Sequence, residues 1–95
     1  MKIIRNKNIV ARKIHGAFFL LDISDNYSND ICALYEINEV GMFLWEKLDC
    51  VDTIDGLASA LSDVIIEEVD YQVLLSDVQD FINALIAKRF VAEQA

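Results

Sequence analysis

The sequence is short of the residues that most catalytic and metal sites require. Among its 95 residues there is no proline, and there are three glycines, two cysteines and one histidine. A zinc site needs three or four ligands, and Cys32, Cys50 and His15 show no Cys-x-x-Cys or comparable spacing. Residues 1–5 lack the apolar core of a signal peptide, which favours free thiols in a reducing compartment. We therefore expect no metal, no cofactor and a cytoplasmic location.

Positive charge is also scarce. Eight Lys and Arg stand against 16 Asp and Glu, which gives a net charge of −8. Nucleic-acid binding requires cationic contacts to phosphates, so this balance argues against a nucleic-acid partner. The basic residues at the start of the chain fit a solvated edge strand: Lys2, Arg5, Lys7, Arg12 and Lys13. Long apolar runs are missing too, since none approaches the ~20 residues of a membrane span, and we expect no membrane contact.

Apolar residues, by contrast, are abundant. They make up 55% of the chain, and the mean hydropathy of +0.32 is high for a small soluble protein. A chain of this length forms one domain with one core. Apolar residues beyond those that the core needs often mark an interaction surface. We therefore expect a single domain over residues 1–95 that binds a partner.

The first part of the chain predicts three strands. Apolar segments at 8–14 and 17–23 are separated by His15-Gly16, which suits a turn, and a polar loop at 24–30 leads to a third segment at 31–37. Short connections favour an antiparallel meander with the third strand at its edge. In that strand Cys32, Leu34 and Glu36 should face one way, and Ala33, Tyr35 and Ile37 the other.

The rest of the chain predicts three helices. Apolar residues at helical spacing follow Asn38, then Asp52 or Thr53, then Asp70, and all four are good N-cap residues. The third helix is expected to run to about Lys88. Strands followed by helices indicate an α+β fold, here a three-stranded antiparallel β-meander followed by a three-helix bundle, in a winged helix-turn-helix-like arrangement.

A DNA-binding role is not supported by the third helix. A recognition helix presents cationic and amide side chains to the major groove. The outer face of this helix instead carries Asp77, Gln79, Asp80 and Asn83, with its cations only at the far end.

Four segments resemble the PqqD family. Residues 34–49 (LYEINEVGMFLWEKLD) are similar to its x-LNExG-x-x-hW-x-LLD stretch, and residues 53–61 (TIDGLASAL) to its TVEELAxxL helix. Residues 77–85 (DVQDFINAL) are similar to its DVxxFLxxL helix, and Phe90-Val91 to its GLV-like end. The departures are Ile37 for Leu, Gly56 for an acid and Arg89-Phe90 for Gly-Leu. The resemblance covers about residues 8–91.

The resemblance implies a recognition element for ribosomally made, modified peptides. Family members bind the leader segment of a precursor peptide and present it to a modifying enzyme, such as a radical S-adenosylmethionine enzyme or a lasso-type leader peptidase. The leader is expected to add as a strand to residues 31–37, beside the third helix. The expected peptide-binding residues come from both elements: Cys32, Ala33, Leu34, Tyr35, Glu36, Leu74, Asp77, Val78, Phe81, Leu85 and Lys88.

Other interpretations stay open. Helical Leu, Val and Phe residues more often form a core than a ligand groove. A catalytic role would need a nucleophile with a base, and the couple Cys32 and His15 lacks an orienting group, so we expect no enzyme. The alternative function is a non-catalytic dimerisation or regulatory winged-helix-like module, and the chain is expected to be a monomer or an edge-paired dimer.

Overall fold

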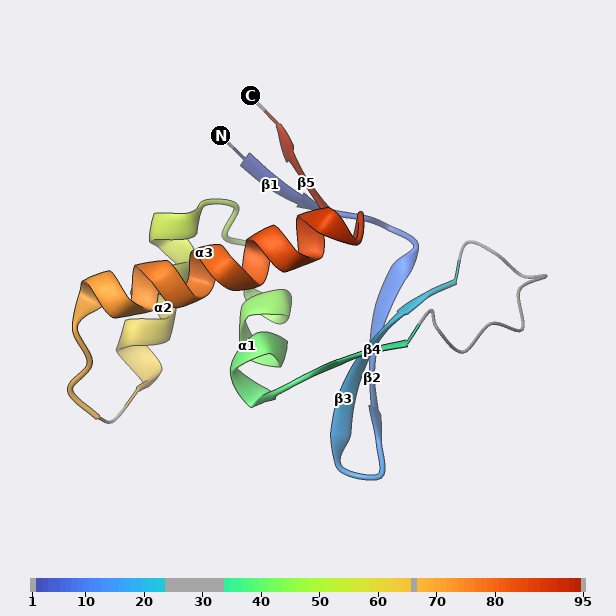
Figure 1. Cartoon of the computed structure of the whole chain (residues 1–95), viewed down its shortest axis with the longest axis horizontal. Coiled ribbons are helices and arrows are strands. Elements are labelled where there is room, and N and C mark those ends of the chain that lie inside the picture. Colours follow the sequence, from blue (N-terminus) through green and yellow to red (C-terminus); the bar gives the residue numbers. More distant parts are fainter. Residues whose placement is uncertain (1, 24–33, 66, 95) are drawn as a thin grey trace.

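The computed structural model describes residues 2–23, 34–65 and 67–94. Within these ranges the chain forms five strands and three helices (Figure 1). In chain order they are β1 (Lys2–Arg5), β2 (Ile9–Ile14), β3 (Ala17–Asp22), β4 (Leu34–Ile37), α1 (Glu39–Lys47), α2 (Ile54–Val64), α3 (Tyr71–Ala87) and β5 (Val91–Gln94). The predicted α+β class is confirmed.

The strands β2, β3 and β4 form the predicted antiparallel meander, in that order, with β4 at an edge. His15 (φ 51°) and Gly16 (φ 84°) both have positive φ angles. A two-residue hairpin turn of type I′ requires this left-handed conformation at both central residues. In β4, Ile37 is buried and Glu36 is exposed, as the alternation predicts. Residues 31–33 of the predicted third strand lie outside the described residues.

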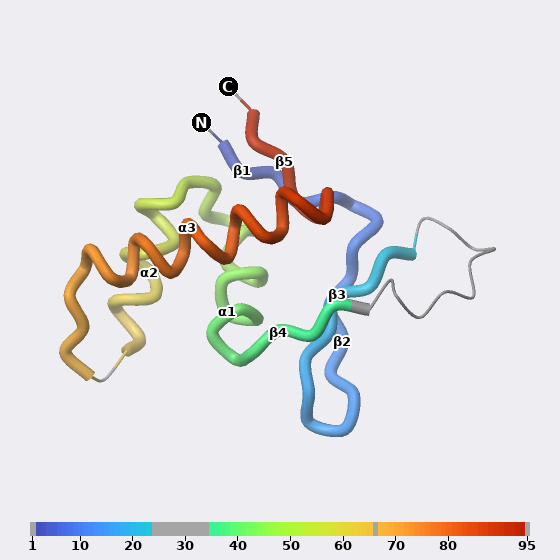
Figure 2. The backbone as a smooth tube through the Cα atoms, viewed as in Figure 1, coloured from blue at the N-terminus to red at the C-terminus, as the bar shows by residue number. Residues whose placement is uncertain are grey.

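A second sheet was not predicted. β1 pairs antiparallel with β5, from Lys2 opposite Gln94 to Arg5 opposite Val91. Figure 2 shows these two strands side by side next to the ends of the chain. The expectation of a solvated basic patch was wrong for Arg5. Its guanidinium donates to the carbonyl oxygen of Trp45 (3.3 Å) and forms an ion pair with Asp49 (2.9 Å).

All three helices begin at side-chain caps. The side chains of Asn38, Thr53 and Asp70 accept hydrogen bonds from backbone N–H groups in the first turns of α1, α2 and α3. Each bond satisfies one of the donors that a helix start leaves free. Thr53, rather than Asp52, caps α2.

One core lies between the helices and the inner sides of the strands. It contains Trp45 and a set of fully buried side chains: Leu20, Leu44, Leu57, Val78, Ile82 and Leu85. Only Asn38 separates β4 from α1, so the strand leads straight into the helix bundle. No helix in the described ranges is both long enough and apolar enough to cross a membrane.

Candidate functional site

Two contacts join α3 to the segment formed by β4 and the start of α1. At the C-terminal end of α3, the Nζ of Lys88 lies 4.7 Å from the centre of the Tyr35 ring. In the middle of α3, Phe81 lies close to Gly41, since a Cβ on Gly41 would be 3.1 Å from Phe81 Cε1. Tyr35 precedes Gly41 in the chain, yet Tyr35 lies at the C-terminal end of α3 and Gly41 lies at its middle. β4 and α3 therefore run in opposite directions, as Figure 1 shows.

The edge of β4 that faces away from β3 is unpaired within the described residues. The sheet order places only β3 beside β4. A strand edge of this kind presents N–H and C=O groups that are free to pair with another extended segment. Tyr35 is half-buried at this strand, and its ring packs edge-on against Phe90 at a centroid distance of 6.0 Å.

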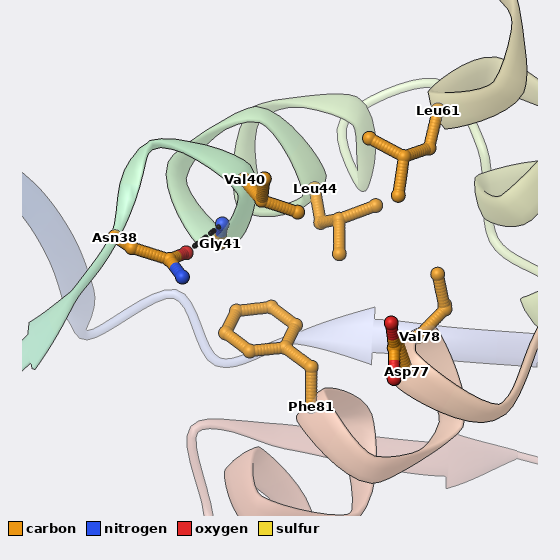
Figure 3. A pocket seen from close by; sticks show the side chains of 8 residues that line it. All are labelled: Asn38, Val40, Gly41, Leu44, Leu61, Asp77, Val78 and Phe81. Carbon is orange, nitrogen blue, oxygen red and sulfur yellow. Dashed lines mark hydrogen bonds between the residues drawn. The ribbon is translucent and has the colours of Figure 1, made fainter. Parts of the chain in front are cut away.

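A cavity of about 280 Å³ opens at the Phe81 end of this arrangement (Figure 3). All three helices contribute to its wall: Asn38, Val40, Gly41, Leu44, Leu61, Asp77, Val78 and Phe81. Figure 3 shows Val40, Leu44 and Leu61 on one side of the space, with Phe81, Val78 and Asp77 across from them. The wall is mostly apolar, and Asp77 is its one charged side chain.

The local sequence explains the shape of this cavity. Gly41 has no side chain, and a Cβ there would also come within 3.1 Å of Ile37 Cβ. Its N–H donates to Asn38 Oδ1 at 2.8 Å, so the cap side chain is held at the cavity wall. On α3, Asp77 and Phe81 are four residues apart and therefore share one face of the helix.

The structure brings five of the eleven predicted site residues to this region. Asp77, Val78 and Phe81 line the cavity, and Tyr35 and Lys88 meet at the other end of α3. Glu36 is exposed and alternates with the inward-facing Tyr35 and Ile37.

Three predicted residues of α3 lie in the core, and one of them, Val78 (0% exposed), also borders the cavity. Leu74 is 5% exposed and Leu85 is 0% exposed. They hold α3 against the rest of the protein, and in this structure they do not line the cavity. Cys32 and Ala33 lie outside the described residues, and for Leu34 the structure describes the strand pairing with Leu21.

Sequence reasoning did not assign the cavity residues of α1 and α2 to the site. These are Asn38, Val40, Gly41, Leu44 and Leu61. Asn38 and Gly41 carried a usable signal, because a cap followed by a helical glycine marks a close approach between elements. Leu44 and Leu61 carried none, because they belong to ordinary apolar helical stripes.

The side chains and the strand edge of this region are suited to binding a partner. The residues that the structure describes include no cluster of three or more His, Cys, Asp or Glu side chains that could hold a metal ion. His15 lies exposed in the β2–β3 turn, while its suggested partner Cys32 is among the undescribed residues. The arrangement offers a strand edge, an apolar cavity with Asp77 on its wall, and Lys88 beside Tyr35 at the other end of α3.

The family model for coenzyme PQQ synthesis protein D (PqqD) matches residues 20–91. The chain belongs to the PqqD family. The match runs from β3 into the start of β5, so it includes the strand edge and the whole of the cavity wall. The resemblance inferred from the sequence motifs is thereby confirmed.

Solved structures with the PqqD-like fold of this chain include two peptide complexes. TbiB1 in complex with the TbiA(β) leader peptide is 21% identical, with a TM-score of 0.73, over 100% of this chain and 99% of that one. Lasso peptide synthetase B1 complexed with the leader peptide is 14% identical, also with a TM-score of 0.73, over 98% of this chain and 100% of that one. These likenesses establish the fold. No curated protein sequence matches the chain.

Proposed function

We propose that this PqqD-family protein binds the leader segment of a ribosomally made precursor peptide and presents it to a modifying enzyme. The observation that carries the proposal is the edge of β4 that has no partner strand among the described residues, together with the apolar cavity between the three helices. Membership of the PqqD family supports it. Proteins of the same fold that are solved with leader peptides, TbiB1 and lasso peptide synthetase B1, support it further.

The proposed mechanism is strand addition. The leader pairs with the free edge of β4 through main-chain hydrogen bonds, while side chains of the leader enter spaces beside α3. Backbone pairing supplies affinity without regard to sequence, and the cavity supplies selectivity. The proposed contacts combine Tyr35, Asp77, Phe81 and Lys88 with the predicted strand residues Cys32, Ala33, Leu34 and Glu36. Leu74, Val78 and Leu85 would act from the core, by holding α3 in place.

The protein itself is proposed to act without catalysis or a cofactor, as one domain over residues 1–95 in the cytoplasm. The chemistry would belong to the enzyme that receives the peptide, either a radical S-adenosylmethionine enzyme or a leader peptidase. A second use of the same edge is self-association, because two copies of β4 could pair with each other. In leader binding a peptide pairs with the edge of β4, whereas in self-association the β4 strand of a second copy pairs with it.

The test begins with a search of the neighbouring genes for a short precursor peptide, whose leader is then titrated with the chain. We expect saturable binding by fluorescence anisotropy, with a submicromolar to micromolar dissociation constant. Some β4 residues have backbone N–H groups that point away from β3. Amide exchange at these residues should slow when the peptide binds, because the N–H groups become hydrogen-bonded. A stable dimer that has no affinity for the leader would instead support edge pairing between copies.

A further inference from the structure

The cavity beside Phe81 combines apolar walls with a single unpaired charge. Asp77 is exposed at the cavity, and the ion pair found in the described part of the chain is that of Arg5 with Asp49. Val40, Leu44 and Phe81 line the same cavity and give it apolar walls. Lys and Arg side chains match this combination, because their methylene stems pack on apolar surface while the cationic head stays at a polar rim.

The size of the cavity and the charge of the protein favour the same occupant. At about 280 Å³ the cavity is just below the ~300–1,000 Å³ of typical small-molecule sites, so it suits one long side chain. The net charge of −8 draws cationic segments toward the protein and repels acidic ones. Phe81 adds an aromatic ring that a cation can approach.

The second charge lies at the other end of the same helix. Lys88 follows Asp77 by eleven residues. At 1.5 Å per residue of helix this is about 16 Å, which an extended chain covers in about five residues at ~3.3 Å each. Lys88 Nζ rests over Tyr35, on the strand that would pair with the peptide, so an acidic side chain of that peptide can reach it.

The direction of the bound segment follows from the sheet. Every strand pair in the structure is antiparallel, and antiparallel pairing is slightly the more stable arrangement. A segment antiparallel to β4 runs in the same direction as α3, because β4 and α3 are opposed. Its N-terminal part then lies near Asp77 and its C-terminal part near Lys88.

We infer that the region between the edge of β4 and α3, from the cavity at Asp77 to Lys88, forms a peptide groove. This groove selects a charge pattern: a Lys or Arg that enters the cavity and pairs with Asp77, followed about five residues later by an Asp or Glu at Lys88. This inference rests on the proposed function, since it names the class of leader that the site accepts. The cationic residue is the anchor, and the acidic residue sets the direction.

The test is a selection from a displayed library of random peptides long enough to span the groove, against the full chain. Wild-type protein should enrich a basic residue followed at the stated distance by an acidic one. Asp77→Asn should lose the basic preference alone, and Lys88→Gln the acidic preference alone. The matched controls remove the same charges outside the groove: Asp80→Asn on α3, and Lys47→Gln, whose Nζ lies over Phe43. Both controls should keep the whole pattern.

Single peptides from the selection give the magnitude. For a peptide that carries both charges, Asp77→Asn should weaken binding about fivefold in low salt, and added salt should reduce that difference. The same variant should not change affinity for a peptide with norleucine in place of the basic residue.

The outcomes separate the inference from the function on which it rests. The selection can enrich peptides that have no charge pattern and that wild type and Asp77→Asn bind equally well. This result would overturn the inferred charge pattern but would leave peptide binding intact. The two charges in reverse order overturn the assigned direction. If no peptide is enriched and the leader of the neighbouring precursor also fails to bind, both the inference and the proposed function fall.

Discussion

Lys88 Nζ lies 4.7 Å from the centre of the Tyr35 ring and thereby connects the end of α3 with β4. Lys88 is also the C-cap of α3, where a cation interacts favourably with the helix dipole. Tyr35 in turn packs edge-on against Phe90, which follows the helix. This group of three side chains sets the spacing between the last turn of α3 and β4, whose outer edge has no partner in the described part of the chain.

The contact between Lys88 and Tyr35 should be measurable as a coupling free energy. We expect a double-mutant cycle with Lys88→Gln and Tyr35→Leu to give about 0.5–1 kcal/mol, the range for an exposed cation over an aromatic ring. The measurement is the free energy of unfolding in urea for the four proteins. A control cycle with Lys47→Gln and Tyr35→Leu should be additive, because Lys47 lies over Phe43 instead. Additivity in both cycles would contradict the contact.

Gly41→Ala should destabilise the protein even though alanine favours helices. The new methyl group would lie 3.1 Å from Ile37 Cβ and from Phe81 Cε1. Alanine gains about 1 kcal/mol of helix propensity over glycine, while crowding of this kind costs about 1–3 kcal/mol, so we expect a net loss of about 1 kcal/mol. Thermal unfolding followed by circular dichroism measures it.

The crowding at Gly41 has a direct control. Phe81→Leu removes the ring atom that the new methyl group meets, so the loss caused by Gly41→Ala should be smaller in a Phe81→Leu background than in wild type. Ile37 remains in place, and part of the loss should therefore persist. A stabilising effect of Gly41→Ala in the wild-type background would show that α1 does not approach β4 this closely.

Phe81→Ala should separate peptide binding from stability. Phe81 lines the cavity, whereas Phe43 is a half-buried phenylalanine of α1 outside the cavity wall. Both substitutions remove partly buried ring surface and should cost about 1–3 kcal/mol of stability, less than the 3–5 kcal/mol of a fully buried ring. Only Phe81→Ala should weaken leader binding, by about tenfold or more. Equal affinities of the two variants for the leader, measured by anisotropy, would show that Phe81 is not part of the peptide-binding groove.

The parts of the fold that local sequence determines were predictable. Asn38, Thr53 and Asp70 act as caps through bonds to N–H groups two or three residues away, so their signal lies within one turn of helix. The β2–β3 hairpin also depends on neighbours, because His15 and Gly16 alone form its turn. The pairing of β4 with β3 followed from the short connections in the meander.

The parts that depend on distant residues were not predictable. β1 and β5 are four residues each and pair across almost the whole chain, so neither carries a long enough pattern to be recognised alone. The apolar stripe of α3 is wide enough to meet more than one neighbouring element. Its periodicity therefore does not reveal that Leu85 faces the core while Phe81 faces a cavity. Leu61 reaches that cavity only because α2 packs against α3.

Arg5 should contribute more to stability than its position near the chain terminus suggests. Its guanidinium bonds to the Trp45 carbonyl oxygen and to Asp49, and lies 5.5 Å from the centre of the Trp45 ring. Asp49 is 79% exposed, so the ion pair itself is worth less than about 1 kcal/mol, and the bond to the carbonyl adds to it. We expect Arg5→Gln to lower the free energy of unfolding by about 1–2 kcal/mol.

Arg12→Gln is the matched control for Arg5→Gln. Arg12 is exposed, and its guanidinium bonds only to the carbonyl oxygen of its neighbour Ala11 among the described contacts. Its loss should change stability by less than about 0.5 kcal/mol. Urea unfolding of the two variants, at low and at high salt, tests both expectations, since salt should reduce only the ion-pair part of the Arg5 effect. Equal effects of the two substitutions would mean that β1 is held by its pairing with β5 and not by α1.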